Sequence, residues 1–545
     1  MIRLIRKESR WYVGSILLFL LATNAGYLSS WFRTPPSHRY TGIGLESVGD
    51  KLVYYSMIEQ GREGMLFMKN RHTSEDQRAL LFSPHWYLVG MTSQFLGISP
   101  VASYHMYRLL FILVFLWLLY LFILKLYATE RERHLAYATV LFASGLGWYF
   151  LEHHPEIVRP DLHWMYTFQQ HPVDIYVTEM NTFINTVQSP LFIVSYILLL
   201  LNINMFLNAT LRSSTRTTML LFGTTLLAAL IHPYDIIILS AVLGSWSVWY
   251  LARFKSWQPL WRLIPVALAL LLSVSYWLWI FSHEPALAGW LEQNITISPR
   301  LSMYLWGMGI FGPLWALGLW ALYRSKEKNP WWVFVAIWSS INWLLIYLPF
   351  QTNRRFSTAW FIPLSLMGFY AIRYLLRRMK SFVLQSALLT CFLILGFSGV
   401  LWRVVVYVTY TPSLAEKYSV YHDPYVADLL SFAQKNFKPD DIMLASEGFI
   451  TMTVGAFAPV RLYAGHGHQT ANFLLKNQQA EWFFAPPQTP TALNRREDFL
   501  RSARIDHIVL YKPALKDYAW LLGARFLNVV FVNEGFVVLN RLDHG

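Results

Sequence analysis

The sequence is poor in cysteine and in charged residues. A single cysteine, Cys391, occurs among 545 residues, which excludes a fold held together by intrachain disulfides. Asp, Glu, Lys and Arg make up 14% of the chain, about half their share in a typical soluble domain. Apolar residues make up 55% of the chain. This balance is typical of a protein that spans a membrane.

The sequence also lacks a dinucleotide-binding motif. The stretch Gly465-His-Gly-His-Gln-Thr470 resembles one but has no third glycine for the pattern G-x-G-x-x-G. The net charge of +14 would suit a nucleic-acid partner. In a membrane protein, however, Lys and Arg flanking the spans on the cytoplasmic side account for it. We therefore expect neither a dinucleotide cofactor nor a nucleic-acid partner.

The chain contains a series of apolar stretches, most of them close to the ~20 residues that a membrane-spanning helix requires. The basic start of the chain resembles that of a signal peptide. Its apolar core continues to Trp31, so we expect an uncleaved anchor. The sequence predicts about eleven spans, at residues 11–30, 103–127, 135–152, 190–210, 217–232, 235–253, 262–281, 303–323, 331–350, 359–377 and 381–401.

The distribution of Lys and Arg predicts the orientation of these spans. If the N-terminus is cytoplasmic, the inside segments hold nineteen Lys and Arg residues and the short outside loops hold four. Short cytoplasmic loops are the ones enriched in these residues. Eleven spans then place the long first loop (31–102), the second outside loop (153–189) and the C-terminal tail outside the cytoplasm.

The tail has a different pattern from the rest of the chain. Short apolar runs that read as strands alternate with helical segments, which predicts a small α/β domain. The predicted strands cover 441–446, 461–465, 507–512, 526–533 and 536–542, and Asp423 is a predicted N-cap. We therefore predict a helical transmembrane domain over 1–405 and a soluble α/β domain over 406–545.

The first loop carries two acidic residues, Glu46 and Asp50, four positions apart in a stretch that reads as a short amphipathic helix. At this spacing both would lie on one helical face. Partial burial near a membrane raises the proton affinity of a carboxylate, which suits a general base. Alternatively, both residues are solvated charges on a loop helix.

The second outside loop carries further candidate residues. In the second outside loop, Asp174, Glu179 and Asn181 have the side chains to hold hydroxyl groups, or to serve as ordinary loop polarity and helix caps. His153, His154, His163 and His171 of this loop do not have the tight spacing of metal ligands.

Arg354 and Arg355 stand together on a short outside turn, against the positive-inside tendency. Arginine suits bidentate phosphate recognition. The alternative is that both side chains anchor the turn among lipid headgroups.

Several of these motifs, in their order along the chain, resemble bacterial GT-C membrane glycosyltransferases related to the protein O-mannosyltransferases and the lipid A aminoarabinose transferases. The resemblance covers nearly the whole chain. It rests on the following stretches: Asp50-Lys-Leu-Val-Tyr54-Tyr-Ser56 with Gly61 and Gly64; Tyr107-Arg108; Asp174 to Asn181; His232-Pro-Tyr-Asp235; Arg354-Arg355-Phe356 leading to Pro363; and Gly465-His466 with Thr470 and Lys476.

The resemblance implies a GT-C-like fold and transfer of a sugar from a polyprenyl-phosphate carrier to an extracytoplasmic glycan, lipid or protein, in a bacterial plasma membrane. It implies that Asp50, or else Glu46, is the base and that Arg354 and Arg355 hold the leaving phosphate. The other residues implied in substrate binding are Glu179, Asn181, Asp174, Tyr54, Arg108, His232, His466 and Lys476. The first loop has no Asp-x-Asp, so a divalent metal has no support in the sequence and no residue is assigned to one.

Two other classes of function stay open. A transporter or flippase would fit the number of spans, but its signature is ionisable residues in mid-span and broken inverted repeats. The predicted spans are nearly free of acidic residues. A catalytically inactive relative that acts as a receptor or assembly factor through its tail would have the same sequence features as an enzyme.

The charge distribution yields a testable topology. We expect Lys326 and Arg377 to face the cytoplasm and Gly465 to face outside. After Cys391 is replaced, single cysteines at these positions can be reacted with a membrane-impermeant reagent in intact cells. The expected result is labelling at position 465 alone, and labelling at 326 but not at 465 would contradict the predicted orientation.

Overall fold

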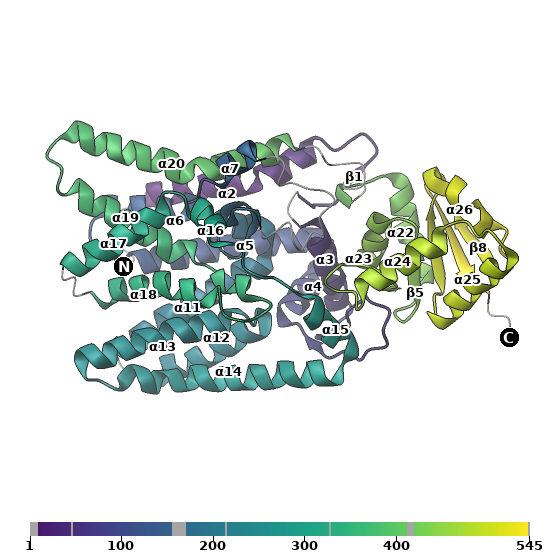
Figure 1. Cartoon of the computed structure of the whole chain (residues 1–545), viewed down its shortest axis with the longest axis horizontal. Coiled ribbons are helices and arrows are strands. Elements are labelled where there is room, and N and C mark those ends of the chain that lie inside the picture. The colour runs from purple at the N-terminus through teal and green to yellow at the C-terminus, as the bar shows by residue number, and fades with distance from the viewer. Residues whose placement is uncertain are drawn as a thin grey trace. The chain divides into compact units, whose positions relative to one another are not determined.

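A computed structural model describes residues 9–44, 47–154, 170–212, 215–325, 329–410, 412 and 419–542. The chain divides into two compact units, each of which we describe separately (Figure 1). The transmembrane unit comprises Met1–Ala25, Tyr107–Tyr276 and Ile295–Val408. The loop–tail unit comprises Gly26–Met106, Trp277–Asn294 and Thr409–Gly545. The tail, predicted as a domain over 406–545, thus belongs to one unit with most of the first loop.

Helices make up the transmembrane unit, and some of them continue into the loop–tail unit. The longer ones are α2 (Ser9–Phe32), α5 (Pro100–Ile123), α11 (Pro190–Arg212), α12 (Thr215–Ile231), α13 (Asp235–Phe254), α14 (Gln258–His283), α17 (Phe311–Ser325), α18 (Pro330–Leu345), α19 (Phe361–Leu376) and α20 (Phe382–Thr409). Shorter helices are α6 (Glu130–Phe142), α7 (Gly147–His153), α9 (Val173–Tyr176), α10 (Thr182–Gln188), α16 (Leu301–Met308) and the 3-10 turn η3 (Asn353–Ser357).

Among the residues that the structure describes, seven helical segments are long and apolar enough to cross a membrane. Helices α16 and α17 form an eighth candidate if the pair counts as one span, with a bend of 82° between them. Gly309 at this bend has a positive φ of 52°, which glycine adopts without steric cost. The polytopic helical fold is confirmed, whereas the number of about eleven spans stays a prediction.

The span predicted at 135–152 is two short helices, α6 and α7, separated by residues 143–146. Backbone N–H groups in this break bond to other segments, that of Ser144 to Gly396 O at 2.8 Å and that of Leu146 to Trp306 O at 3.0 Å. A Cβ atom on Gly145 would lie 2.1 Å from Gly307 O, so only glycine allows this approach. Contacts between distant segments therefore override the continuous apolar pattern.

The loop–tail unit combines short strands with helices. From the first loop come β1 (Arg39–Tyr40), α3 (Val48–Arg62), β2 (Phe67–Met68), β3 (Leu81–Phe82) and α4 (Pro84–Leu96), and α15 (Pro285–Gln293) follows the long helix α14. The tail contributes β4 (Tyr421–His422), α22 (Pro424–Asn436), β5 (Ile442–Ala445), α23 (Gly448–Phe457), β6 (Arg461–Leu462), α24 (Phe473–Phe484), α25 (Pro490–Ser502), β7 (His507–Tyr511), the 3-10 turn η4 (Lys512–Ala514), α26 (Leu515–Leu522), β8 (Leu527–Val532) and β9 (Phe536–Arg541).

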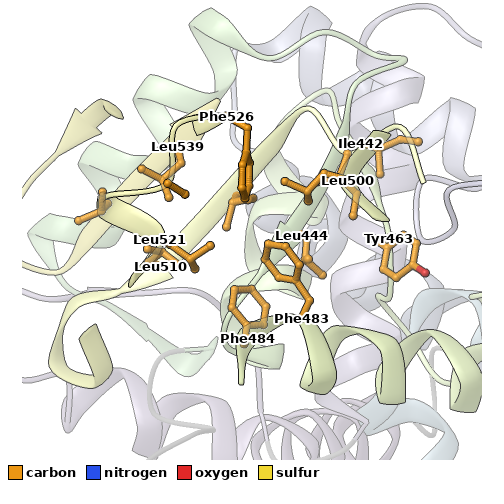
Figure 2. Close-up of a cluster of buried hydrophobic side chains, with 14 residues drawn as sticks. Ile442, Leu444, Tyr463, Phe483, Phe484, Leu500, Leu510, Leu521, Phe526 and Leu539 are labelled. Atoms are coloured by element: carbon orange, nitrogen blue, oxygen red, sulfur yellow. The ribbon is translucent and has the colours of Figure 1, made fainter. Parts of the chain in front are cut away.

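The tail folds around a five-stranded sheet in the order β6-β5-β7-β9-β8. Strand β5 is parallel to β6 and β7, and β9 is antiparallel to β7 and β8. Apolar side chains from strands and helices form its core, among them Leu444, Phe483, Leu510 and Phe526 (Figure 2). The predicted α/β tail is confirmed, and so is the Asp423 cap, which accepts a hydrogen bond from the Val426 N–H at 2.8 Å.

A segment of the first loop pairs with strand β6 of the tail. The Leu462 N–H donates to Arg71 O at 2.9 Å, and Thr73 forms an antiparallel bridge with Ala464. Exposed strand edges tend to recruit other strands, and covering them is a common solution. The first loop covers the β6 edge here and is thereby fixed to the tail.

Candidate active site

Asp50 lies in the first turn of α3, where a negative charge interacts favourably with the helix dipole. The opposite side of the helix is apolar, and Leu52, Tyr55 and Ile58 are fully buried. The Asp50 side chain is 39% exposed. Its predicted neighbour Glu46 lies outside the described residues. Asp50 is therefore an accessible carboxylate on a helix that its other face holds in place.

The structure brings Asp50 together with His466 of the tail. The distance between His466 Nε2 and Asp50 Oδ1 is 3.3 Å. His466 follows β6, and the carboxyl ends of parallel strands are the usual place for functional residues in α/β sheets. Two residues that the sequence singled out separately are thus in contact.

His72 of the first loop is buried beside this pair, and the sequence analysis did not single it out. Burial, together with the nearby His466 and Arg71, lowers the pKa of His72 to about 3, so its ring is neutral. Neither ring nitrogen has a hydrogen-bond partner among the described residues. The Thr470 hydroxyl donates to His72 O and ties the tail loop to this segment. No motif marks His72 in the sequence.

The predicted ligands Tyr54 and Lys476 contact other parts of the protein. The Tyr54 ring stacks on Trp86, with 4.7 Å between ring centroids. Lys476 Nζ lies 2.6 Å from Glu75 Oε1 and donates to Ser74 Oγ at 2.8 Å. Burial lowers the pKa of Lys476, although Glu75 opposes the shift. The ammonium group of Lys476 therefore fastens the tail to the first loop, and a substrate contact for it stays a prediction.

A second polar centre lies in the transmembrane unit. Arg355 Nη1 is 3.1 Å from Glu179 Oε1, and the Arg355 guanidinium lies 4.9 Å from the centroid of the Tyr234 ring. Backbone contacts fix the Glu179 segment, because Glu179 O accepts hydrogen bonds from Tyr196 Oη and the Ala359 N–H. Arg355 is thus paired with a buried carboxylate, and both the phosphate role and the headgroup-anchoring alternative stay predictions.

Electrostatics keep Glu179 ionised. Burial alone would raise its pKa, but the charges of Arg355 and Arg354 outweigh burial, and the pKa of Glu179 lies below its usual value. Arg354 is partly buried, and its backbone N–H donates to Thr296 O at 3.1 Å. Two arginines and one carboxylate leave one net positive charge on these three side chains, which suits an anionic group.

His232 belongs to the same unit and contacts Asp235, which in turn accepts a hydrogen bond from Ser195; neither of these two was among the predicted ligands. Its Nδ1 lies 2.8 Å from Asp235 Oδ1, and Ser195 Oγ donates to the other oxygen of that carboxylate. His232 and Asp235 are both buried. The turn His232-Pro-Tyr-Asp235 was noted in the sequence, but Ser195 lies in a span and carries no signal.

Asn181 and Arg108 make internal contacts. The Asn181 side chain caps α10 by accepting from the N–H groups of Phe183 and Ile184, and it donates to Ala143 O at 3.0 Å. Arg108 is buried and donates to Thr186 O at 3.2 Å and to Asn24 Oδ1. The capping alternative thus describes what Asn181 does in this structure, and the predicted substrate contacts of both residues remain untested.

Asp174 is a buried carboxyl, and among the described residues it forms no ion pair. Its Oδ2 accepts from the Gly147 N–H at 3.3 Å, while a Cβ at position 147 would lie 2.1 Å from Oδ1. Burial raises the pKa of Asp174 to about 7, although the Gly147 N–H and Arg403 oppose the shift. Asp174 therefore titrates near neutral pH.

The described residues do not contain a group of three or more His, Cys, Asp or Glu side chains arranged to hold a metal ion.

The fold has known counterparts. The crystal structure of the Archaeoglobus fulgidus oligosaccharyltransferase in complex with Zn and sulfate matches with a TM-score of 0.54 and 11% identity, over 96% of this chain and 73% of that chain. A structure of the same enzyme tethered to an acceptor peptide matches over 98% of this chain and 74% of that chain, with a TM-score of 0.47 and 13% identity. No family model and no curated protein matches the sequence. The chain therefore has the fold of this oligosaccharyltransferase, a helical membrane protein as predicted, while the bacterial relatives inferred from the motifs stay a prediction.

The environment of Asp174 predicts a pH-dependent stability. The pKa of Asp174 in the folded protein is about 7, above its ordinary value of 3.8. The protonated, buried form therefore contributes stability that is fully present below about pH 4 and is lost as the pH rises through 7. Within this window each pH unit changes the free energy of unfolding by up to about 1.4 kcal/mol.

We expect Asp174→Asn to remove this dependence, because the amide does not titrate. The measurement is thermal unfolding of the purified protein in detergent at a series of pH values. The exposed Asp498 provides a matched control as Asp498→Asn, which should keep the wild-type slope. An unchanged slope in Asp174→Asn would show that Asp174 does not titrate in this range.

Proposed function

We propose that this chain is an integral membrane glycosyltransferase that moves a sugar from a polyprenyl-phosphate carrier to an extracytoplasmic glycan, lipid or protein, with inversion at the anomeric carbon. The observation that carries the proposal is the accessible carboxylate of Asp50, held by the ring of His466 in a chain with the fold of an oligosaccharyltransferase. Structural, transport and receptor roles do not require a carboxylate held in this way.

In the proposed reaction, Asp50 accepts the proton of an acceptor hydroxyl as its oxygen attacks the anomeric carbon. The bond between that carbon and the phosphate oxygen breaks, and its electron pair leaves with the polyprenyl phosphate. General-base assistance of this kind typically accelerates a reaction by 10²- to 10⁴-fold. The 39% exposure of the Asp50 side chain supports the assignment, because an acceptor must reach the base.

The phosphate gains one negative charge as the sugar leaves. The transmembrane unit offers Arg354 and Arg355 with Glu179, three side chains that together carry one excess positive charge. Groups fixed in advance around a developing charge stabilise it without reorganisation at the moment of reaction. The contacts of Arg355 with Glu179 and Tyr234 supply this fixation. In the proposal, Arg354 and Arg355 hold the departing phosphate.

The assignment of the base predicts the behaviour of Asp50→Asn. This nearly isosteric variant should lower turnover by at least about 10²-fold, with little change in donor binding, because the base acts on the acceptor. The measurement uses purified protein with radiolabelled undecaprenyl-phosphate hexoses and pentoses and a mixed set of glycan, lipid and peptide acceptors. Glu46→Gln is the matched comparison and should cost less. If both variants are as active as wild type, neither carboxylate is the base. If the wild-type protein transfers no sugar from any of these donors, the transporter and inactive-relative alternatives gain.

The assignment of the phosphate site predicts a different signature. Arg354→Ala and Arg355→Ala should each weaken donor use by about 1.5–3 kcal/mol, the range for a hydrogen bond to a charged group. Lysine at either position should rescue only part of the loss, because the guanidinium fork is missing. Donor concentration series at saturating acceptor provide the measurement. Wild-type donor kinetics in both alanine variants would contradict this role.

A further inference from the structure

We infer that His466 is a positioning residue for Asp50: its Nε2–H holds one carboxylate oxygen, and the bare Cα of Gly49 makes room for its ring. This inference rests on the proposed function for the chemical role of Asp50. The contact itself stands on the geometry of the loop–tail unit.

The hydrogen bonds of His466 determine its tautomer. The His468 N–H donates to His466 Nδ1 at 3.2 Å, so Nδ1 presents its lone pair. In a neutral imidazole the other nitrogen then carries the proton. Nε2 is that nitrogen, and it lies 3.3 Å from Asp50 Oδ1. The nitrogen that carries the proton is therefore the one that contacts the carboxylate.

This tautomer decides which member of the Asp50–His466 pair can act as the base. In the usual aspartate–histidine arrangement, the carboxylate orients the ring and the second ring nitrogen accepts the proton. Here the lone pair of that second nitrogen is already occupied by the His468 N–H. His466 is thus not available as the base, and the pair works in the opposite direction, with the histidine holding the carboxylate.

Gly49 explains how the ring reaches Asp50. A Cβ atom at position 49 would lie 3.0 Å from His466 Cδ2 and 3.2 Å from Nε2. Glycine is an unfavourable residue within a helix, and alanine is the most favourable. Gly49 in the first turn of α3 is therefore less favourable for the helix than alanine, but it leaves the space that the His466 ring occupies.

The tail loop that carries His466 is itself anchored. Gly465 N–H donates to Thr470 Oγ1 at 2.9 Å, and the Thr470 hydroxyl donates to His72 O. The backbone pairing of Thr73 with Ala464 lies immediately before this loop. The segment that carries His466 is thus fixed to the first loop, which carries Asp50. In this inference the tail therefore helps to position the base.

The first test measures the Asp50 carboxylate directly and needs no substrate. A water-soluble carbodiimide with glycinamide reacts with protonated carboxyl groups, and peptide mass spectrometry gives the labelling rate of Asp50 at a fixed, mildly acidic pH. A donor hydrogen bond favours the ionised form and slows the reaction. His466→Leu should therefore label Asp50 about tenfold faster than wild type does. His466→Gln, similar in size but with an amide donor, should lie much closer to wild type.

Gly49→Ala keeps Asp50 and His466 and reduces only the space available to the His466 ring. It should raise the labelling rate of Asp50 and lower kcat by up to about 10²-fold through misplacement, with little effect on donor KM. Gly223→Ala is the matched control, because Gly223 lies in helix α12 with no heavy atom within 4 Å of an added Cβ. The exposed Asp498 is the internal reference for labelling, and thermal unfolding checks that each variant is folded.

The outcomes separate this inference from the proposed function. Wild-type labelling of Asp50 in His466→Leu and in Gly49→Ala overturns the positioning role, whatever the turnover. Loss of turnover in Asp50→Asn with normal turnover in both His466→Leu and Gly49→Ala also overturns it and leaves the base assignment standing. Normal turnover in Asp50→Asn overturns the base assignment, while the labelling rates still decide whether His466 holds the carboxylate.

Discussion

The contact between Asp50 and His466 depends on the backbone pairing between the first loop and strand β6. It joins Arg71 and Thr73 to Leu462 and Ala464, residues that are far apart in the sequence. Backbone hydrogen bonds of this kind tolerate many side chains, so the pairing requires little of the local sequence. Its consequence is specific nonetheless. It fixes the tail loop that follows β6 and carries His466 to the first loop, which carries Asp50.

The transmembrane unit shows a different constraint, the cost of burying charge. An isolated ionised group in an apolar interior loses its hydration, and removing one partner of a buried pair is far more damaging than replacing both. Glu179 is buried and ionised, and it remains so because Arg355 and Arg354 accompany it. Such a cluster is weak evidence for stability. Binding of an anion, as the proposed function requires, would give the excess positive charge of Arg354, Arg355 and Glu179 a purpose.

Local patterns in the sequence were sufficient for much of the fold. The strands β5, β7, β8 and β9 lie where alternating and continuous apolar runs predicted them, and Asp423 caps α22 as expected. The break between α6 and α7 was not predictable, because it is caused by backbone contacts with Gly396 and Trp306, far along the chain. A hydropathy pattern does not predict which distant carbonyl group a backbone N–H will bond to.

The same limit applies to the candidate site. Asp50, His466, Glu179 and Arg355 were each recognisable as residue types suited to the chemistry, but their pairing was not. Polar side chains that read as ligands can equally be used inside the fold, as Asn181 is in capping α10. Gly49 carried no signal at all, because the reason for a glycine there is a side chain more than four hundred positions away.

Three of the predicted site carboxylates that the structure describes occupy three different environments, and this difference is the ground for choosing Asp50 as the base. Asp174 is buried, and its raised pKa leaves it largely protonated in mildly acidic conditions. Glu179 is ionised but buried against arginines, which stabilise its negative charge and weaken its affinity for a proton. Asp50 is accessible, and its Oδ1 lies 3.3 Å from His466 Nε2. Enzymes assign acid and base roles to like residues through such differences in surroundings. A general base must be reachable by the acceptor, and of these three carboxylates Asp50 is the exposed one, whereas Asp174 and Glu179 are buried.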